Sequence, residues 1–122
     1  MKPKYNIFQN FSYALKGILF FMKREYSARI LLTITAIVLI AGSYFKITRT
    51  EWIALIVCIG LVLAMELMNS AIELLVDKLW PDYHQTAGNI KDLAAGAVLL
   101  TSLAAAIIGC IIFAPKLFGL LH

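Results

Sequence analysis

Three long apolar stretches constrain the fold of this chain more than any other feature. They cover residues 30–45, 52–65 and 93–113, and none of them contains a charged side chain. With its flanks, each approaches the about 20 residues that a helix needs to cross the hydrocarbon core of a bilayer. Backbone groups in hydrocarbon must bond within their own segment, which favours helices. The sequence therefore predicts one all-α integral membrane domain over residues 1–122, with spans at 29–46, 51–79 and 90–114.

The composition and the charge distribution agree with this interpretation. Hydrophobic residues make up 61% of the 122 residues, which is too many for a soluble domain of this size. The net charge is +4, and the basic residues gather before the first span and beside the second connection. The positive-inside rule then places the N-terminus and the second connection in the cytoplasm. Because these charges flank membrane spans, we expect them to contact anionic lipid headgroups and not nucleic acid.

Residues 5–25 are predicted to form an amphipathic helix on the cytoplasmic surface of the membrane. Apolar side chains recur there at helical intervals, at Phe8, Phe11, Leu15, Ile18 and Met22. Glu25 continues this apolar face, which is a local conflict of the kind that often marks a functional site. An alternative is that Glu25 simply forms a salt bridge with Arg29, one turn later on the same face.

Several residues predict where the helices begin and end, and what the cysteines do. Thr50 is a candidate N-cap for the second span. Pro81 is expected to end that span, and Pro115 to end the third. Cys58 and Cys110 lie inside membrane stretches without CxxC spacing, so we expect free thiols that fill packing space.

A row of polar side chains continues the second span beyond residue 65. At 100° per residue, Glu66, Asn69, Glu73 and Asp77 fall within an arc of about 80° on one helix face. Carboxylates at a membrane boundary are costly unless they are paired, hydrated or bound to a cation. This acidic face therefore predicts either a metal site or a polar seam paired with basic residues of neighbouring subunits.

The acidic face belongs to a larger set of polar residues at the same boundary. The set comprises Glu25, Arg29, Glu66, Asn69, Glu73, Asp77, Asp82, His84, Lys91 and Asp92. Paired acids beside a lysine suit Mg²⁺-assisted phosphoryl transfer, because Mg²⁺ prefers carboxylate and phosphate oxygens and the transfer needs charge neutralisation and a base. The sequence contains neither a Walker-type phosphate loop nor a kinase-type glycine loop, so any nucleotide site here has a different design.

One stretch of the acidic face resembles a known family signature. Residues 66–73 read Glu-Leu-Met-Asn-Ser-Ala-Ile-Glu and are followed by Val76 and Asp77. This stretch is similar to the signature of the prokaryotic diacylglycerol kinase family, which includes diacylglycerol kinases of Gram-negative bacteria and undecaprenol kinases of Gram-positive bacteria. The likeness extends to residues 13–17, 25–29, 83–84 and 91–97, and it covers nearly the whole chain.

The resemblance implies a Mg²⁺-dependent lipid kinase of the bacterial cytoplasmic membrane. It implies a homotrimer whose active sites, shared between subunits at the cytoplasmic boundary, transfer the γ-phosphate of ATP to the primary hydroxyl of a membrane lipid. Glu66 is implied as the general base, and Glu25 and Glu73 as the Mg²⁺ ligands. Contacts to ATP are implied for Tyr13, Glu25, Glu73, Asp82, Tyr83, His84, Lys91 and Asp92. Supporting or substrate-binding roles are implied for Asn69, Arg29 and Asp77.

Three positions depart from the family pattern. Leu31 stands where relatives carry an acid or a histidine, Asn6 lies where enterobacterial members have an arginine, and Ala14 replaces their serine. None of the three is an implied base or metal ligand. The sequence has features of both branches, so two acceptors remain open. They are diacylglycerol, which would become phosphatidic acid, and undecaprenol, which would become undecaprenyl phosphate.

Two functions of other classes would also use membrane carboxylates. A small cation/proton exchanger needs one buried acid near the middle of a helix bundle, whereas the acids here cluster at one boundary beside Lys91 and Asp92. An inactive membrane scaffold would have no need of the complete set of implied catalytic and metal-binding residues.

Overall fold

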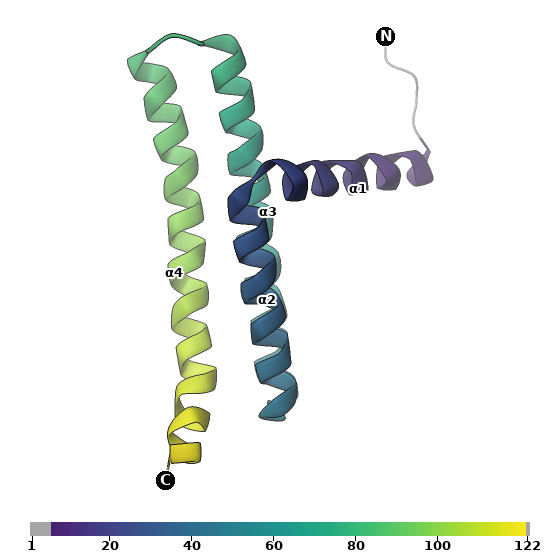
Figure 1. The fold of residues 1–122 in the computed structure, drawn as a ribbon, viewed down its shortest axis with the longest axis vertical. Coiled ribbons are helices and arrows are strands. Elements are labelled where there is room, and N and C mark those ends of the chain that lie inside the picture. Colours follow the sequence, from purple (N-terminus) through teal and green to yellow (C-terminus); the bar gives the residue numbers. More distant parts are fainter. Residues whose placement is uncertain (1–5, 122) are drawn as a thin grey trace.

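The computed structural model describes residues 6–121, which form four helices in chain order. These are α1 (Ile7–Arg24), α2 (Tyr26–Tyr44), α3 (Arg49–Leu79) and α4 (Gln85–Leu121). Helices α3 and α4 run antiparallel and pack along their length, α2 lies beside α3, and α1 projects sideways from the start of α2 (Figure 1). The predicted all-α class is confirmed, while residue 5, the expected start of the first helix, lies outside the described residues.

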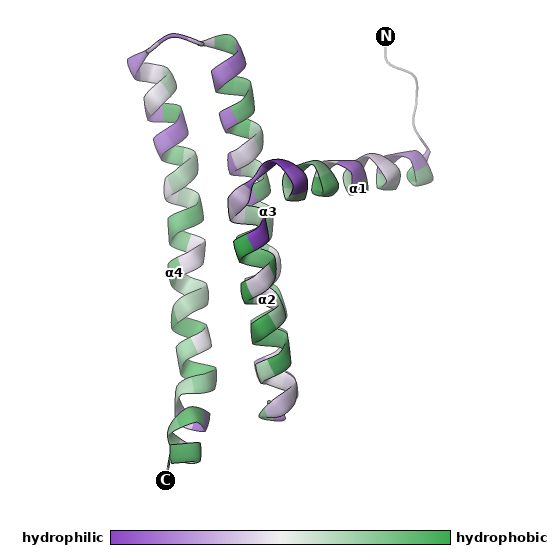
Figure 2. Ribbon diagram, viewed as in Figure 1, coloured by the Kyte–Doolittle hydropathy of each residue, from purple (hydrophilic) through white to green (hydrophobic). Residues whose placement is uncertain are grey.

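Helices α2, α3 and α4 are each long and apolar enough to cross a membrane. Their middle parts are largely hydrophobic, whereas hydrophilic residues gather along α1 and at the ends of α3 and α4 that the α3–α4 loop connects (Figure 2). Large apolar side chains are exposed along the helices, and Leu100 of α4 keeps 71% of its surface exposed. Lipid, and not water, is the solvent in which such exposure is stable.

Reciprocal hydrogen bonds explain where α1 and α3 begin. Asn6 Oδ1 accepts from the backbone N–H of Gln9 at 2.8 Å, and Gln9 Oε1 accepts from that of Asn6 at 3.0 Å. Thr48 and Glu51 form the same capping box at the start of α3, at 3.2 Å and 2.9 Å. The prediction of Thr50 as the N-cap is therefore wrong, because the acid that completes the box lies three residues after Thr48.

The link between α3 and α4 is shorter than the sequence suggested. Helix α3 ends at Leu79, two residues before Pro81, as expected. Helix α4 begins at Gln85 and not near residue 90. The Nδ1 atom of His84 accepts from the backbone N–H of Ala87 at 3.4 Å and so satisfies one of the free donors at the start of the helix.

The prediction that Pro115 ends the last helix is wrong, because α4 continues through it to Leu121. Pro115 lacks the backbone donor that would bond the carbonyl of Ile111, and membrane helices tolerate such a proline more readily than soluble ones. Next to Pro115, Lys116 Nζ donates to the carbonyl of Ile112 at 3.1 Å and to a carboxylate oxygen of Glu51 at 2.9 Å. The Lys116–Glu51 ion pair holds this end of α4 against the start of α3.

The tightest packing lies at the end of the molecule where the α2–α3 turn passes α4. Ile47, Leu55 and Ile112 form a buried cluster there. Gly42 of α2 faces Trp52 of α3 so closely that a Cβ atom added at Gly42 would lie 2.8 Å from Cη2 of the indole ring. Glycine is therefore required at this position for close approach and not for an unusual backbone angle.

Replacing Gly42 by alanine should lower the free energy of unfolding by about 1–3 kcal/mol, the usual effect of overpacking. Gly60 of α3 is the matched control, because a Cβ there would meet nothing within 4 Å. Alanine at Gly60 should leave stability unchanged or raise it by about 0.5–1 kcal/mol. Thermal unfolding of both variants in the same detergent measures the difference, and equal stability of the two variants would contradict the packing argument.

Candidate active site

Helix α3 carries all four residues of the predicted acidic face on one unbroken helix. Asn69 is buried, and its Nδ2 donates to Oε1 of Glu73 at 3.1 Å. This contact leaves the second carboxylate oxygen of Glu73 available for another ligand. The Oδ1 atom of Asn69 is also buried, and no group in residues 6–121 donates to it. A buried acceptor of this kind marks a position where a further donor, a water or a cation fits.

Glu66 receives a hydrogen bond from a different helix. Ser27, in the first turn of α2, donates its hydroxyl to Oε1 of Glu66 at 3.0 Å. Both side chains are partly buried. Sequence reasoning missed Ser27, because the two residues are 39 positions apart and nothing local indicates the contact. Its position two residues after Glu25 was the one available signal.

Glu25 lies at the break between α1 and α2, where the backbone is extended with φ −99° and ψ 125°. Its carboxylate is 3.6 Å from Nε of Arg24. The alternative pairing with Arg29 is wrong, since Arg29 Nη2 instead donates to the carbonyl of Lys23 at 3.4 Å. That pairing assumed one continuous helix, and the break at Glu25 removes the shared face on which it depended.

A groove of about 420 Å³ separates α1 from α3 and includes Glu25 in its wall. Most of its lining is apolar and comes from both helices, including Phe21 of α1 and Leu67 of α3. Arg24, Glu25 and the buried Ser70 are its polar residues. The groove is therefore an apolar space that reaches Glu25, between α1 and the helix that carries the acidic face.

The far end of the acidic face is paired with α4. Lys91 Nζ lies 2.8 Å from Oδ1 of Asp77, and both side chains remain partly exposed to solvent, at 39% and 59%. The structure thus brings these two predicted residues together across the α3–α4 loop. Asp92 follows on the exposed side of α4. This end of the molecule offers an ammonium group that is held in place yet open to a soluble anion.

The loop residues that were expected to contact a nucleotide are solvent-exposed. Tyr83 keeps 92% of its surface exposed, and Asp82 and His84 are exposed as well. The His84 ring lies 5.8 Å from the ring of Trp80, and His84 also caps α4. Tyr13, on α1, has the ammonium of Lys16 above its ring at 5.4 Å and is half-exposed. Within residues 6–121 of one chain, these aromatic side chains do not form a single enclosed site with the acidic face.

Whether these residues can hold Mg²⁺ depends on whether a phosphate ligand binds with it. Among the described residues, no three His, Cys, Asp or Glu side chains converge on a point that could hold a metal ion. Mg²⁺ does not need such a cage, since one or two carboxylates commonly hold it together with waters and substrate phosphates. The free oxygen of Glu73 and the buried Oδ1 of Asn69 are ligands of the preferred kind. The acidic face therefore fits Mg²⁺ that arrives with a phosphate ligand.

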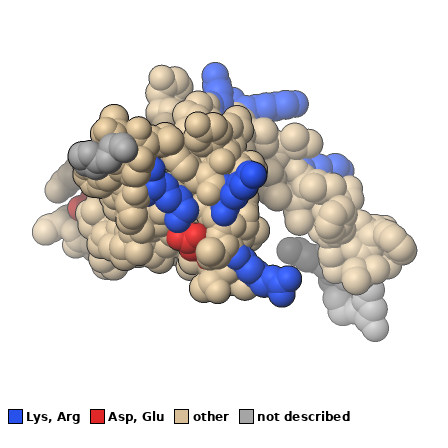
Figure 3. Space-filling model, turned by 90° about the horizontal axis from the view of Figure 1, so that it is seen from below, with Lys and Arg blue, Asp and Glu red and all other residues tan. Residues whose placement is uncertain are grey.

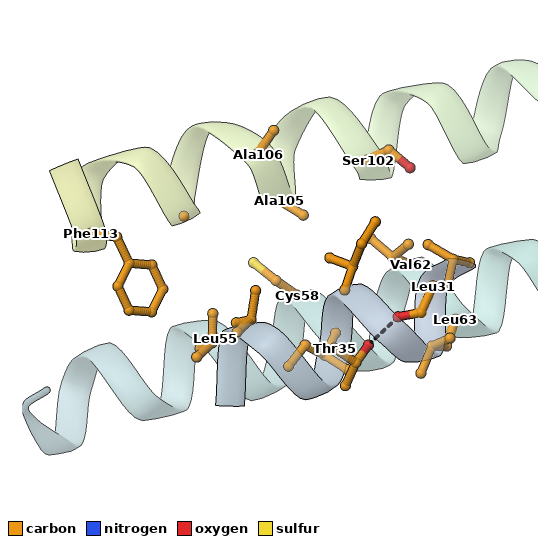
Figure 4. A pocket seen from close by; sticks show the side chains of 14 residues that line it. Leu31, Thr35, Leu55, Cys58, Val62, Leu63, Ser102, Ala105, Ala106 and Phe113 are labelled. Carbon is orange, nitrogen blue, oxygen red and sulfur yellow. Dashed lines mark hydrogen bonds between the residues drawn. The ribbon is translucent and has the colours of Figure 1, made fainter. Parts of the chain in front are cut away.

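A second cavity, of about 320 Å³, lies between α2, α3 and α4 and contains no acid. Thr35, Cys58 and Ser102 are among the few polar side chains in its wall, and Figure 4 shows Ala105 and Phe113 of α4 directed toward α2 and α3. The Thr35 hydroxyl is occupied by the carbonyl of Leu31 at 2.7 Å. Cys58 and Cys110 are free thiols, as predicted. This cavity is an apolar space at membrane depth and not part of the acidic site.

The two ends of the molecule differ in charge. The end seen in Figure 3 exposes scattered lysine and arginine side chains on a mainly uncharged surface, with little acidic surface. Glu51, which lies at that end, is occupied by Lys116 and Thr48. The other six acids of the sequence lie on α3 from residue 66 onward, in the α3–α4 loop, in the first turns of α4 or at the α1–α2 break.

The site thus combines an acidic face of fixed spacing on α3 with a lysine–aspartate pair near the start of α4. Residues 12–113 match the family model described as prokaryotic diacylglycerol kinase. The chain belongs to the prokaryotic diacylglycerol kinase family. The family predicted from residues 66–77 is therefore confirmed.

Three relatives show how far the similarity extends. The undecaprenol kinase of Bacillus subtilis is 36% identical over 110 residues, which cover 90% of this chain and 89% of that protein. A diacylglycerol kinase of Synechocystis is 33% identical over 95% of this chain and 67% of its own length. The diacylglycerol kinase of Escherichia coli is 40% identical over 60 residues, 49% of each chain.

Replacing Asn69 by alanine should destabilise the protein by about 1–3 kcal/mol, because Glu73 would lose a buried donor to a charged group. Asn89 is the matched control, since it lies exposed on α4. Thermal unfolding in one detergent compares the two variants. If Asn69→Ala and Asn89→Ala have the same melting temperature, the Asn69–Glu73 hydrogen bond does not stabilise the fold.

Proposed function

We propose that this protein is an ATP- and Mg²⁺-dependent kinase that phosphorylates the primary hydroxyl of a membrane lipid. The observation that carries the proposal is the arrangement along α3. Glu66, held by Ser27, lies nearest the apolar part of the helix, and Glu73, held by Asn69, follows two turns later. Family membership supports the same assignment. Neither an ion exchanger nor a scaffold requires two carboxylates held separately in this order.

The chain's own residues supply the parts that phosphoryl transfer needs. Glu66 takes the proton from the lipid hydroxyl as that oxygen attacks the terminal phosphorus atom of ATP, and ADP leaves with the oxygen that bridged the β- and γ-phosphates. Glu73 and Glu25 would hold Mg²⁺, and Asn69 keeps the Glu73 carboxylate in place through the 3.1 Å hydrogen bond. The ion would supply neutralisation of the charge on the phosphates.

The soluble substrate would bind where the chain is exposed. Lys91 presents its ammonium to the ATP phosphates and is kept in position by Asp77 at 2.8 Å. Asp92 and the loop residues Asp82, Tyr83 and His84 contact the nucleoside, and Tyr13 of α1 lies at the edge of the nucleotide site. Because these groups are solvent-exposed in one chain, the nucleotide site needs further protein surface to enclose it.

A homotrimer with shared sites would supply that protein surface. Along α3, Glu66 and Asp77 are eleven residues apart, or about 16 Å at 1.5 Å per residue. Asp77 holds Lys91, so the base and the lysine of one chain are separated by three turns. Assembly of copies would bring the Lys91 of one subunit toward the Glu66 of another.

We further propose that α1 lies on the cytoplasmic surface of a bacterial inner membrane. Its sideways projection in Figure 1 and its alternating apolar and polar residues suit an interfacial helix. Arg29, exposed near the start of α2, is placed to contact lipid headgroups. With the N-terminus in the cytoplasm, the α3–α4 loop and Lys91 face the side where ATP is available.

The proposed acceptor is diacylglycerol, with undecaprenol as the alternative. The relative from Bacillus subtilis, which covers 90% of the chain, is named for undecaprenol and supports the alternative. The relatives from Synechocystis and Escherichia coli are named for diacylglycerol. Purified protein in bicelles, supplied with labelled ATP, Mg²⁺ and either lipid, distinguishes the two. Label in neither lipid from a folded protein would overturn the proposed function.

In this assay Glu66→Gln should lower turnover by about 10²–10⁴-fold, the usual contribution of a general base. Glutamine keeps the size of the side chain and can still accept from Ser27, so the fold should be preserved. Glu51→Gln at the other end of α3 is the control and should keep its turnover. Near-normal activity of Glu66→Gln would exclude Glu66 as the base.

Glu73→Gln should instead alter the response to Mg²⁺. Loss of a residue that only supports a metal ligand typically lowers metal affinity by roughly 10–100-fold. Loss of the carboxylate ligand itself should therefore raise the Mg²⁺ concentration that gives the half-maximal rate by at least this factor. A Mg²⁺ titration of turnover at fixed ATP measures this, with Glu51→Gln again as the control. An unchanged titration curve would remove Glu73 from the metal site.

A further inference from the structure

The hydroxyl of Ser27 donates to a carboxylate on another helix. Ser27 is the second residue of α2, two positions after the N-cap residue Glu25. Helix α2 has no side-chain cap from its N-cap residue Glu25, and the Ser27 hydroxyl is directed across to α3, where it donates to Glu66 Oε1 at 3.0 Å. The next residue, Ala28, is completely buried. The backbone that carries this hydroxyl is therefore held firmly against the rest of the chain.

The contact constrains one oxygen of Glu66 and leaves the other open. A carboxylate offers about four acceptor positions, and a single hydroxyl occupies one of them. A base must be held within hydrogen-bond reach of the proton it removes, and small displacements of positioned groups have large effects on rate. With Oε1 held by Ser27, the orientation of Oε2 toward an incoming hydroxyl is defined before the substrate arrives.

We propose that Ser27 is the positioning residue for Glu66, which holds the carboxylate in the orientation that receives the proton of the lipid hydroxyl. The inference rests on the proposed function, because it gives Ser27 a role only if Glu66 is the base. Ser27 is two residues from Glu25, at the break between α1 and α2. One short segment therefore positions both the base and one of the two carboxylates assigned to Mg²⁺.

The test compares Ser27→Ala with Ser27→Thr in the lipid kinase assay. Alanine should lower kcat by about 10–100-fold, which corresponds to losing a hydrogen bond to a charged group, and the KM for Mg²⁺-ATP should stay within about twofold, because ATP is bound by other residues. Threonine keeps the hydroxyl and should restore kcat. Ser43→Ala is the matched control, since the Ser43 hydroxyl, also on α2, binds the carbonyl of Leu39 in its own helix at 3.1 Å.

A structural role for Ser27 predicts a different pattern. It would lower thermal stability and raise the KM for ATP along with any loss of kcat, and threonine would not restore kcat selectively. Ser27→Cys guards against poor folding of the alanine variant, since it nearly preserves volume but is a weak donor. It should also lose kcat at unchanged stability. Normal kcat in both the alanine and cysteine variants would overturn the proposal.

The same measurements distinguish failure of the proposed function from failure of the role proposed for Ser27. If the unaltered protein labels neither lipid, or if Glu66→Gln stays active, the proposed function fails and the role of Ser27 with it. If the unaltered protein is active, Glu66→Gln is inactive and Ser27→Ala matches Ser43→Ala, only the positioning role fails.

Discussion

Three carboxylates on one membrane helix must each be satisfied at the edge of the hydrocarbon region, and the rest of the fold depends on how this is done. The donors to the three acids come from three helices, one of which is α3 itself. Glu66 accepts from Ser27 of α2, Glu73 from an amide on α3 itself, and Asp77 from Lys91 of α4. Placing these charges at a membrane boundary is costly unless their donors are in reach, and this favours the one arrangement of the helices that brings the donors together.

Properties that depend on neighbouring residues could be predicted from the sequence. Hydropathy over runs of residues indicated three helices, and helical periodicity placed Glu66, Asn69, Glu73 and Asp77 on one face. The Asn69–Glu73 contact follows from the same periodicity, because residues four apart on a helix are neighbours. The family signature is local as well, which is why residues 66–77 sufficed to indicate it.

Contacts between helices could not be predicted in this way. Ser27 reaches Glu66 only because the start of α2 packs beside α3, which no local pattern encodes. A helix boundary at residue 25 was predicted, but the apolar spacing of α1 continues to Glu25 and gives no sign that the backbone becomes extended there. Pro115 has a strong local preference to end a helix, but α4 continues through it, and the neighbouring Lys116 bonds to Glu51 and Ile112.

Helices α3 and α4 form a hairpin braced by an ion pair at each end, Asp77–Lys91 and Glu51–Lys116. In the part of the chain that the structure describes, no ion pair braces α2 against this hairpin. Helix α2 is joined to the hairpin by the Ser27–Glu66 hydrogen bond and by the close approach of Gly42 to Trp52 instead. Its attachment therefore depends on one hydroxyl beside the acidic face and on the lack of a side chain at position 42.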